Sequence, residues 1–116
     1  MQRLNVEVHF FNRSPMSPIS PHTSKAVTEN TPAIKTYEEA RWAELPEAKT
    51  GPVAMSLDLL DALHRRWVSF LRALPEPDWR KAFSHPDWGV VSIEEALGMY
   101  AWHCRHHMAH IRNAEC

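Results

Sequence analysis

The chain lacks most of the features that mark secreted, membrane or nucleic-acid-binding proteins. It has only 2 cysteines, Cys104 and Cys116, among 116 residues, which is too few for a disulfide framework and is typical of reduced thiols in a cytosol. No apolar run approaches the roughly 20 residues that span a bilayer, and the N-terminus has no charged-then-apolar signal pattern. Thirteen basic and 14 acidic residues leave a net charge of −1, which favours neither nucleic acid nor a membrane as a partner. We therefore expect one cytoplasmic domain.

Proline is the unevenly distributed residue. Six of the 9 prolines lie within the first 52 residues, and the stretch Ser14–Pro21 reads SPMSPISP. Such a density removes amide donors and disfavours the helical conformation in the residue before each proline. We therefore predict that residues 1–25 form an irregular segment, within which residues 2–11 could make a short strand. Residues 36–45 are expected to make two helical turns, and residues 47–52 are expected to be a linker.

The second half of the chain carries the periodicity of helices. Apolar residues recur at three- and four-residue spacing over residues 56–74, which predicts an amphipathic helix with Ser56 as its N-cap. Residues 83–91 read FSHPDWGVV and predict a tight turn between two short extended pieces. Ser92 and Glu95 then have the spacing of a capping box, which opens a second helix over residues 93–111.

This second helix contains a cluster of histidines. Four of the chain's 8 histidines fall within eight residues: His103, His106, His107 and His110. His103 and His107 are one turn apart on the face that carries Ile93, so both imidazoles should point inward and reach one ion. Burying two imidazoles is costly, and a divalent metal removes that cost because neutral imidazole is a good ligand. An H-x-x-x-H pair can also be purely structural, and both interpretations stay open on the residues alone.

Other histidines and the cysteine are weaker candidates. His64 should look inward from the middle of the helix over residues 56–74, either as a third ligand, as support for the ligands, or as a hydrogen-bonded histidine at the core boundary. His106 and His110 flank the inward face and are expected to support the ligands or to lie at the boundary. Nothing in the local backbone aims His22 or His85 at an ion. Cys104 is expected to be a small core residue.

Residues 26–111 resemble the DinB-like superfamily, and in particular its YfiT-type metal-dependent hydrolases. The resemblance implies an all-α fold, an antiparallel four-helix bundle, and a zinc or nickel ion bound by three histidines. Two of these belong to an H-x-x-x-H motif on the last helix, which falls on His103 and His107. The segments that carry the resemblance are AVTENTPAIKTYEEARWAELPEAK, SLDLLDALHRRWVSFLRALPEPDW and FSHPDWGVVSIEEALGMYAWHCRHHMAHI.

The chain departs from the family pattern near its N-terminus. The third histidine should lie on an earlier helix, where the proline-rich stretch 13–23 stands instead. We therefore interpret the chain as a truncated or frame-disrupted member, with an irregular segment at 1–25 and a partial DinB-like domain at 26–116. In this incomplete bundle the helices over 56–74 and 93–111 are clear, and their uncovered apolar faces make a homodimer possible.

The resemblance implies three alternatives for function. The first is a hydrolase that uses the histidine-bound metal to activate water against a small-molecule substrate. The second is an S-transferase in which the metal activates a low-molecular-weight thiol. The third is a non-catalytic remnant that retains a partial metal site. The first two would use the same histidines, and no carboxylate has a spacing that marks a general base.

Overall fold

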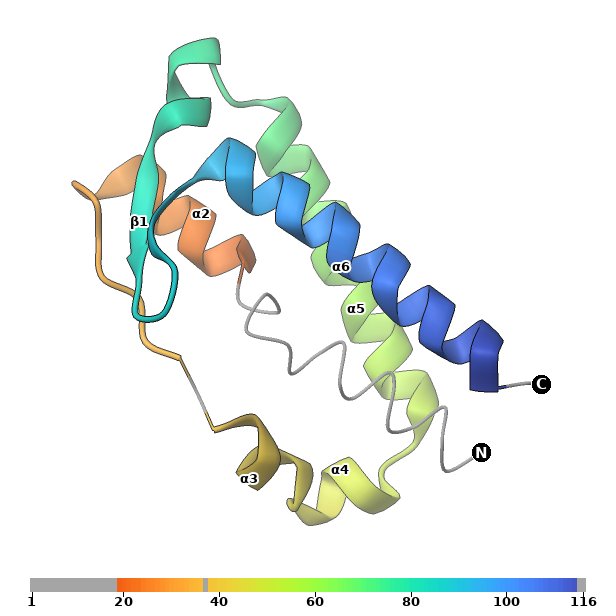
Figure 1. Ribbon diagram of the computed structural model, residues 1–116. Helices are drawn as coiled ribbons and strands as arrows, with labels where there is room; N and C mark the ends of the chain where they lie inside the picture. The colour runs from red at the N-terminus through yellow and green to blue at the C-terminus, as the bar shows by residue number, and fades with distance from the viewer. Residues whose placement is uncertain (1–18, 37, 115–116) are drawn as a thin grey trace.

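Two long antiparallel helices dominate the computed structural model, which describes residues 19–36 and 38–114. Helices α5 (Val53–Arg72) and α6 (Ile93–Ala114) run side by side in opposite directions (Figure 1). The ring of Trp67 on α5 meets the ring of Tyr100 on α6 edge-on, with the ring centroids 4.9 Å apart. The predicted all-α class is confirmed, since the described residues add only one two-stranded hairpin to the helices. No helix among these residues is long and apolar enough to cross a membrane.

Short elements connect and brace the two long helices. The hairpin pairs β1 (Ala82–His85) with β2 (Gly89–Ser92) in antiparallel register, with Phe83 opposite Val91 and His85 opposite Gly89. Gly89 closes the turn with a φ of 75°, a conformation that glycine adopts without steric cost. The predicted turn between two extended pieces is therefore confirmed. The short elements are α3 (Glu39–Ala43), α4 (Pro46–Thr50), the 3-10 helix η1 (Glu76–Arg80), β1 (Ala82–His85) and β2 (Gly89–Ser92).

The end of the hairpin leads directly into α6 through the predicted capping box. The backbone N–H of Ser92 donates to the Glu95 carboxylate at 2.9 Å, and the Glu95 N–H donates to the Ser92 hydroxyl at 3.2 Å. These reciprocal bonds satisfy amide donors that the first turn of a helix leaves without partners. The capping box is thus confirmed, and α6 extends to Ala114, three residues beyond the predicted end.

Two predictions about the segment before residue 56 are wrong. Helix α5 begins at Val53 behind Pro52, so Ser56 lies inside the helix and is not its N-cap. The segment 47–52, expected to be a linker, contributes most of α4, whose first residue is Pro46. Proline is well suited to a first helical position because its missing N–H has no helical partner there and its φ is already helical. Helix α4 therefore starts at a proline, and α5 starts directly after one.

The prediction that residues 1–25 form an irregular segment is wrong for residues 19–25, because helix α2 covers Ile19–Thr28. Pro21 stands in the first turn of α2, where a proline removes no helical hydrogen bond. Thr23 and Ala26 on this helix are buried, at 0% and 2% exposure. Tertiary burial of this face favours a helix that the local proline density alone would argue against. The strand expected at residues 2–11 lies outside the described residues.

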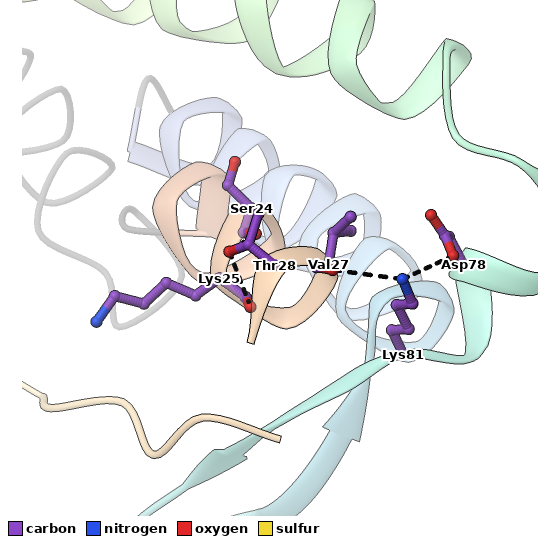
Figure 2. Close-up of polar contacts among 6 residues, drawn as sticks. All are labelled: Ser24, Lys25, Val27, Thr28, Asp78 and Lys81. Atoms are coloured by element: carbon purple, nitrogen blue, oxygen red, sulfur yellow. Dashed lines mark hydrogen bonds and ion pairs between the residues drawn. The ribbon is translucent and has the colours of Figure 1, made fainter. Parts of the chain in front are cut away.

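Helix α2 docks on β1 and on the long helices. The Trp67 indole N–H donates to the hydroxyl of buried Thr23 at 3.1 Å, which connects α5 to α2. The Lys81 ammonium donates to the Val27 carbonyl at 3.3 Å and lies 2.9 Å from the Asp78 carboxylate (Figure 2). A cation at the end of a helix offsets the partial negative charge of its last carbonyls. The core around these contacts consists of Ala26, Ile34, Trp67, Leu71, Phe83, Val91, Ile93 and Ala96.

The stability of this docked helix should depend on pH through His22. Burial, followed by the nearby His85 and Lys25, lowers the pKa of His22 from 6.5 to about 4. The neutral ring packs against Phe83 at a centroid distance of 5.7 Å. Because the native state holds its proton less tightly than the unfolded chain, stability should be constant above pH 6.5 and fall as the pH drops toward 4. His22 is only half-buried, so we expect a loss of about 1–2 kcal/mol.

Urea unfolding between pH 7 and pH 4 measures this loss. His22→Gln keeps a polar side chain without the titration, so its stability should fall less over the same interval than that of the parent protein. If the two proteins lost equal stability between pH 7 and pH 4, the pH dependence would not come from His22.

Candidate metal centre

His103 and His107 lie where the helical spacing predicts, on one face of α6. Their Nε2 atoms are 2.6 Å apart and their ring centroids 4.3 Å apart, with the rings inclined at 64°. His107 is buried at 4% exposure, and His103 is half-buried. The two nitrogen atoms that would bind an ion therefore face each other, one on a buried ring and one on a half-buried ring.

The electrostatic surroundings keep His103 in the form that binds metal. Burial, followed by the neighbouring His107 and His106, lowers the pKa of His103. A lowered pKa leaves the imidazole neutral at pH 7, and only a neutral imidazole has a lone pair to donate. Without an ion, the two Nε2 atoms at 2.6 Å can share only one proton, which a bound cation would displace.

His64 is held by two hydrogen bonds within the α5–α6 pair. Its Nδ1 lies 2.7 Å from the Leu60 carbonyl, to which it must donate, so its Nε2 accepts from the Tyr100 hydroxyl. Burial, together with Cys104 alongside, raises the pKa of Tyr100 above its ordinary value, so the hydroxyl keeps its proton. This geometry places His64 in support of the helix that carries His103 and His107, and its ring nitrogens are engaged in other contacts.

Sequence reasoning missed this His64–Tyr100 bond, although its signal was present. His64 was expected to look inward, and Tyr100 lies three and seven residues before His103 and His107, on the same helix face. Two antiparallel helices bring such positions opposite each other, and a tyrosine that is half-buried there needs a hydrogen-bond partner. Cys104 is half-buried one turn beyond Tyr100, and burial raises the pKa of its thiol, as expected of a packed cysteine.

His85 lies on β1 of the hairpin, and His22 lies on α2 and packs against Phe83 of the hairpin, so both have structural roles there. The Nδ1 of His85 accepts the backbone N–H groups of Asp87 at 3.1 Å and Trp88 at 3.3 Å. Its ring stacks on the Trp88 indole, with centroids 4.0 Å apart and the planes 10° from parallel. These contacts hold the turn closed. Among the described residues, no group of three or more histidine, cysteine or acidic side chains is arranged to hold a metal ion, so the inward pair is not joined by a third ligand there.

Comparison with known proteins places the chain in a family. The model of the DinB superfamily matches residues 4–111 of the chain. The chain belongs to the DinB superfamily. This match begins well before residue 26, where we predicted the domain to start, and that boundary stays a prediction.

Curated DinB relatives come from several Bacillus species. A protein of Bacillus cereus is 54% identical over 86 residues, and a protein of Bacillus mycoides is 52% identical over 86 residues. Each is named "Putative metal-dependent hydrolase", and each alignment covers 74% of this chain and 49% of the relative. The chain therefore spans about half the length of the curated relatives that it matches.

A solved structure shows the same fold. YfiT from Bacillus subtilis, described as "a probable metal-dependent hydrolase with an unusual four-helix bundle topology", superposes with a TM-score of 0.83 at 38% identity. The superposition covers 92% of this chain and 62% of YfiT. The predicted YfiT-type, DinB-like fold is therefore confirmed.

Proposed function

We propose that the protein is a metal-dependent hydrolase whose divalent ion is bound by His103 and His107. The convergence of their Nε2 atoms at 2.6 Å, on a buried face of α6, is the observation that carries this proposal. The names of the Bacillus relatives support it. When bound, a divalent ion would lower the pKa of a coordinated water and so supply a nucleophile near neutral pH. Neutral imidazole suits zinc and nickel, the two metals that we propose.

The residues around the pair have supporting roles in this proposal. His64 and Tyr100 fix α6 against α5 and so orient the face on which both ligands lie. A small-molecule substrate would approach from the solvent side of half-buried His103. The Cys104 thiol is free, in agreement with a cytoplasmic location, which we propose on that ground.

A second candidate function is metal binding without turnover. The observation that favours it is that the described residues contribute only two histidines, whereas a catalytic zinc site ordinarily has three protein ligands and an open position. The thiol-transfer alternative would use the same pair, and no contact among the described residues favours it over hydrolysis. We also propose a homodimer, because α5 exposes Met55 and Leu59 at 62% and 61%.

Metal content and stability test the proposal together. We expect purified protein dialysed against zinc or nickel to retain at least one tightly bound ion per chain. Adding a chelator should then lower the Tm by roughly 10 °C, because an ion at a hundred times its Kd stabilises the native state by about 2.7 kcal/mol. An unchanged Tm and no retained ion would overturn the metal site.

Turnover separates the candidate functions. The ion-loaded protein should hydrolyse a chromogenic ester faster than the same concentration of free ion in buffer. Retained metal without such turnover would favour the binding-only function. Acceleration only when a low-molecular-weight thiol and a chromogenic aryl halide are supplied would favour thiol transfer.

A further inference from the structure

A second histidine pair lies on the outer flank of α6. His106 and His110 are one turn apart and both are exposed. Their ring centroids are 4.2 Å apart and their planes are inclined at 62°. The inward pair has almost the same values, 4.3 Å and 64°. Two imidazoles at this spacing on a helix can bind one cation together, and the structure has two such pairs in succession.

The two pairs differ in burial. His107 is buried at 4% exposure, whereas both members of the outer pair face solvent. Neither outer ring makes a hydrogen bond with another side chain or backbone group in the part of the chain that the structure describes, so their nitrogen atoms are available. An exposed cation keeps water in its remaining coordination positions and needs no further protein ligand.

Trp102 orients the outer pair. Its indole stacks on the His106 imidazole, with centroids 4.9 Å apart and the planes 13° from parallel. Trp102 is itself 62% exposed, so this stack does not belong to the core. A stacked ring loses rotational freedom before it binds a ligand, and that lowers the entropic cost of binding.

We propose that His106 and His110 form a second, solvent-exposed binding site for a divalent transition-metal ion. The two imidazole ligands select copper, nickel and zinc over magnesium or calcium, which prefer oxygen. The rings of His106 and His107 are 5.8 Å apart, so a cation at each pair would repel the other. This repulsion weakens whichever site fills second, and we expect that to be the outer site because both of its imidazoles are exposed to solvent. This site does not depend on hydrolytic activity at the inner pair.

Zinc stoichiometry tests the site. The parent protein and the variant H106A/H110A are dialysed against a series of zinc concentrations, and protein-bound zinc is measured by elemental analysis. At high zinc the parent should bind one equivalent more than the variant, and at low zinc the two should bind equally. Met108→Ala, another exposed change on α6, should behave as the parent does.

Single substitutions show whether the two rings act together. His106→Ala and His110→Ala should each lower the affinity for the second zinc ion on the order of tenfold or more. The reason is that the second imidazole binds an ion that the first imidazole already holds nearby. Equal zinc binding by the parent and H106A/H110A at every concentration would overturn the site. If H106A/H110A lost the tightly bound zinc ion, the proposed outer site would also be overturned, because the outer histidines would then belong to the inner site.

The stacked indole gives an independent readout. Copper(II) quenches the fluorescence of a tryptophan in contact with its ligand, so copper at the outer pair should quench Trp102. In the variant H103A/H107A this quenching should persist. It should disappear when that variant also carries H106A/H110A or Trp102→Phe. Quenching that persists after either of these further substitutions would contradict copper binding at His106. If H103A/H107A does not fold, the zinc comparison of the parent with H106A/H110A decides alone.

Discussion

His107→Ala should lower the affinity for zinc or nickel at least about a hundredfold, because it removes one of the two proposed ligands. Loss of a residue that only supports a ligand costs about ten- to a hundredfold in affinity, and loss of the ligand itself should exceed that. The Nε2 of His107 lies 2.6 Å from that of His103, so the substitution leaves one imidazole where two converge. Metal competition with a chromogenic chelator measures the change.

A matched control separates loss of a ligand from loss of stability. His85 is as buried as His107, at 3% against 4% exposure, but it lies on β1 and holds the hairpin turn. His85→Ala should therefore destabilise the protein by about 1–3 kcal/mol while leaving metal affinity unchanged. His107→Leu, which fills the buried volume, should lose metal as completely as His107→Ala. Equal metal loss from the His85 and His107 variants would show that the ligand assignment is wrong.

Trp67→Ala should cost about 3–5 kcal/mol of unfolding free energy, the largest stability effect that we expect. Trp67 lies on α5, is 4% exposed and contacts two other helices: it meets Tyr100 of α6 edge-on and donates to Thr23 of α2. Truncation removes the apolar contacts and leaves a cavity where these elements meet. Since small domains are stable by only about 5–15 kcal/mol, this loss is a large fraction of the total stability.

Two further variants test the cause of this loss by urea unfolding. Thr23→Val keeps the shape but leaves the buried Trp67 N–H without its acceptor, so it should cost about 1–3 kcal/mol. Trp102→Ala removes the same side chain at 62% exposure and should change stability by about 0.5 kcal/mol or less. If Trp67→Ala and Trp102→Ala were equally mild, the core would not be centred on the contact between α2, α5 and α6.

The elements that were predicted correctly are those whose signals are local. The H-x-x-x-H spacing places His103 and His107 on one face because a helix repeats every 3.6 residues. The capping box of Ser92 and Glu95 is likewise defined within four residues. Such patterns need no knowledge of the rest of the chain.

The predictions that are wrong concern segments where local and tertiary preferences oppose each other. Helix α2 forms within a proline-rich stretch because Thr23 and Ala26 are buried against distant parts of the chain. The segment of α4 was predicted to be a linker, and α5 was predicted to start at residue 56 although it begins at Val53. Proline ends a preceding helix but also begins a following one, and spacing alone does not distinguish the two uses.

The sequence by itself determined the histidine pair, its helix, and the resemblance that the DinB family model and the YfiT superposition confirm. Only the tertiary structure decided what surrounds the pair. It engages His64 with Leu60 and Tyr100, assigns His85 to the hairpin turn, and separates a buried pair from an exposed pair on the same helix. The physical reason is that helical periodicity specifies direction around one axis, whereas burial and hydrogen-bond partners depend on residues far away in the chain.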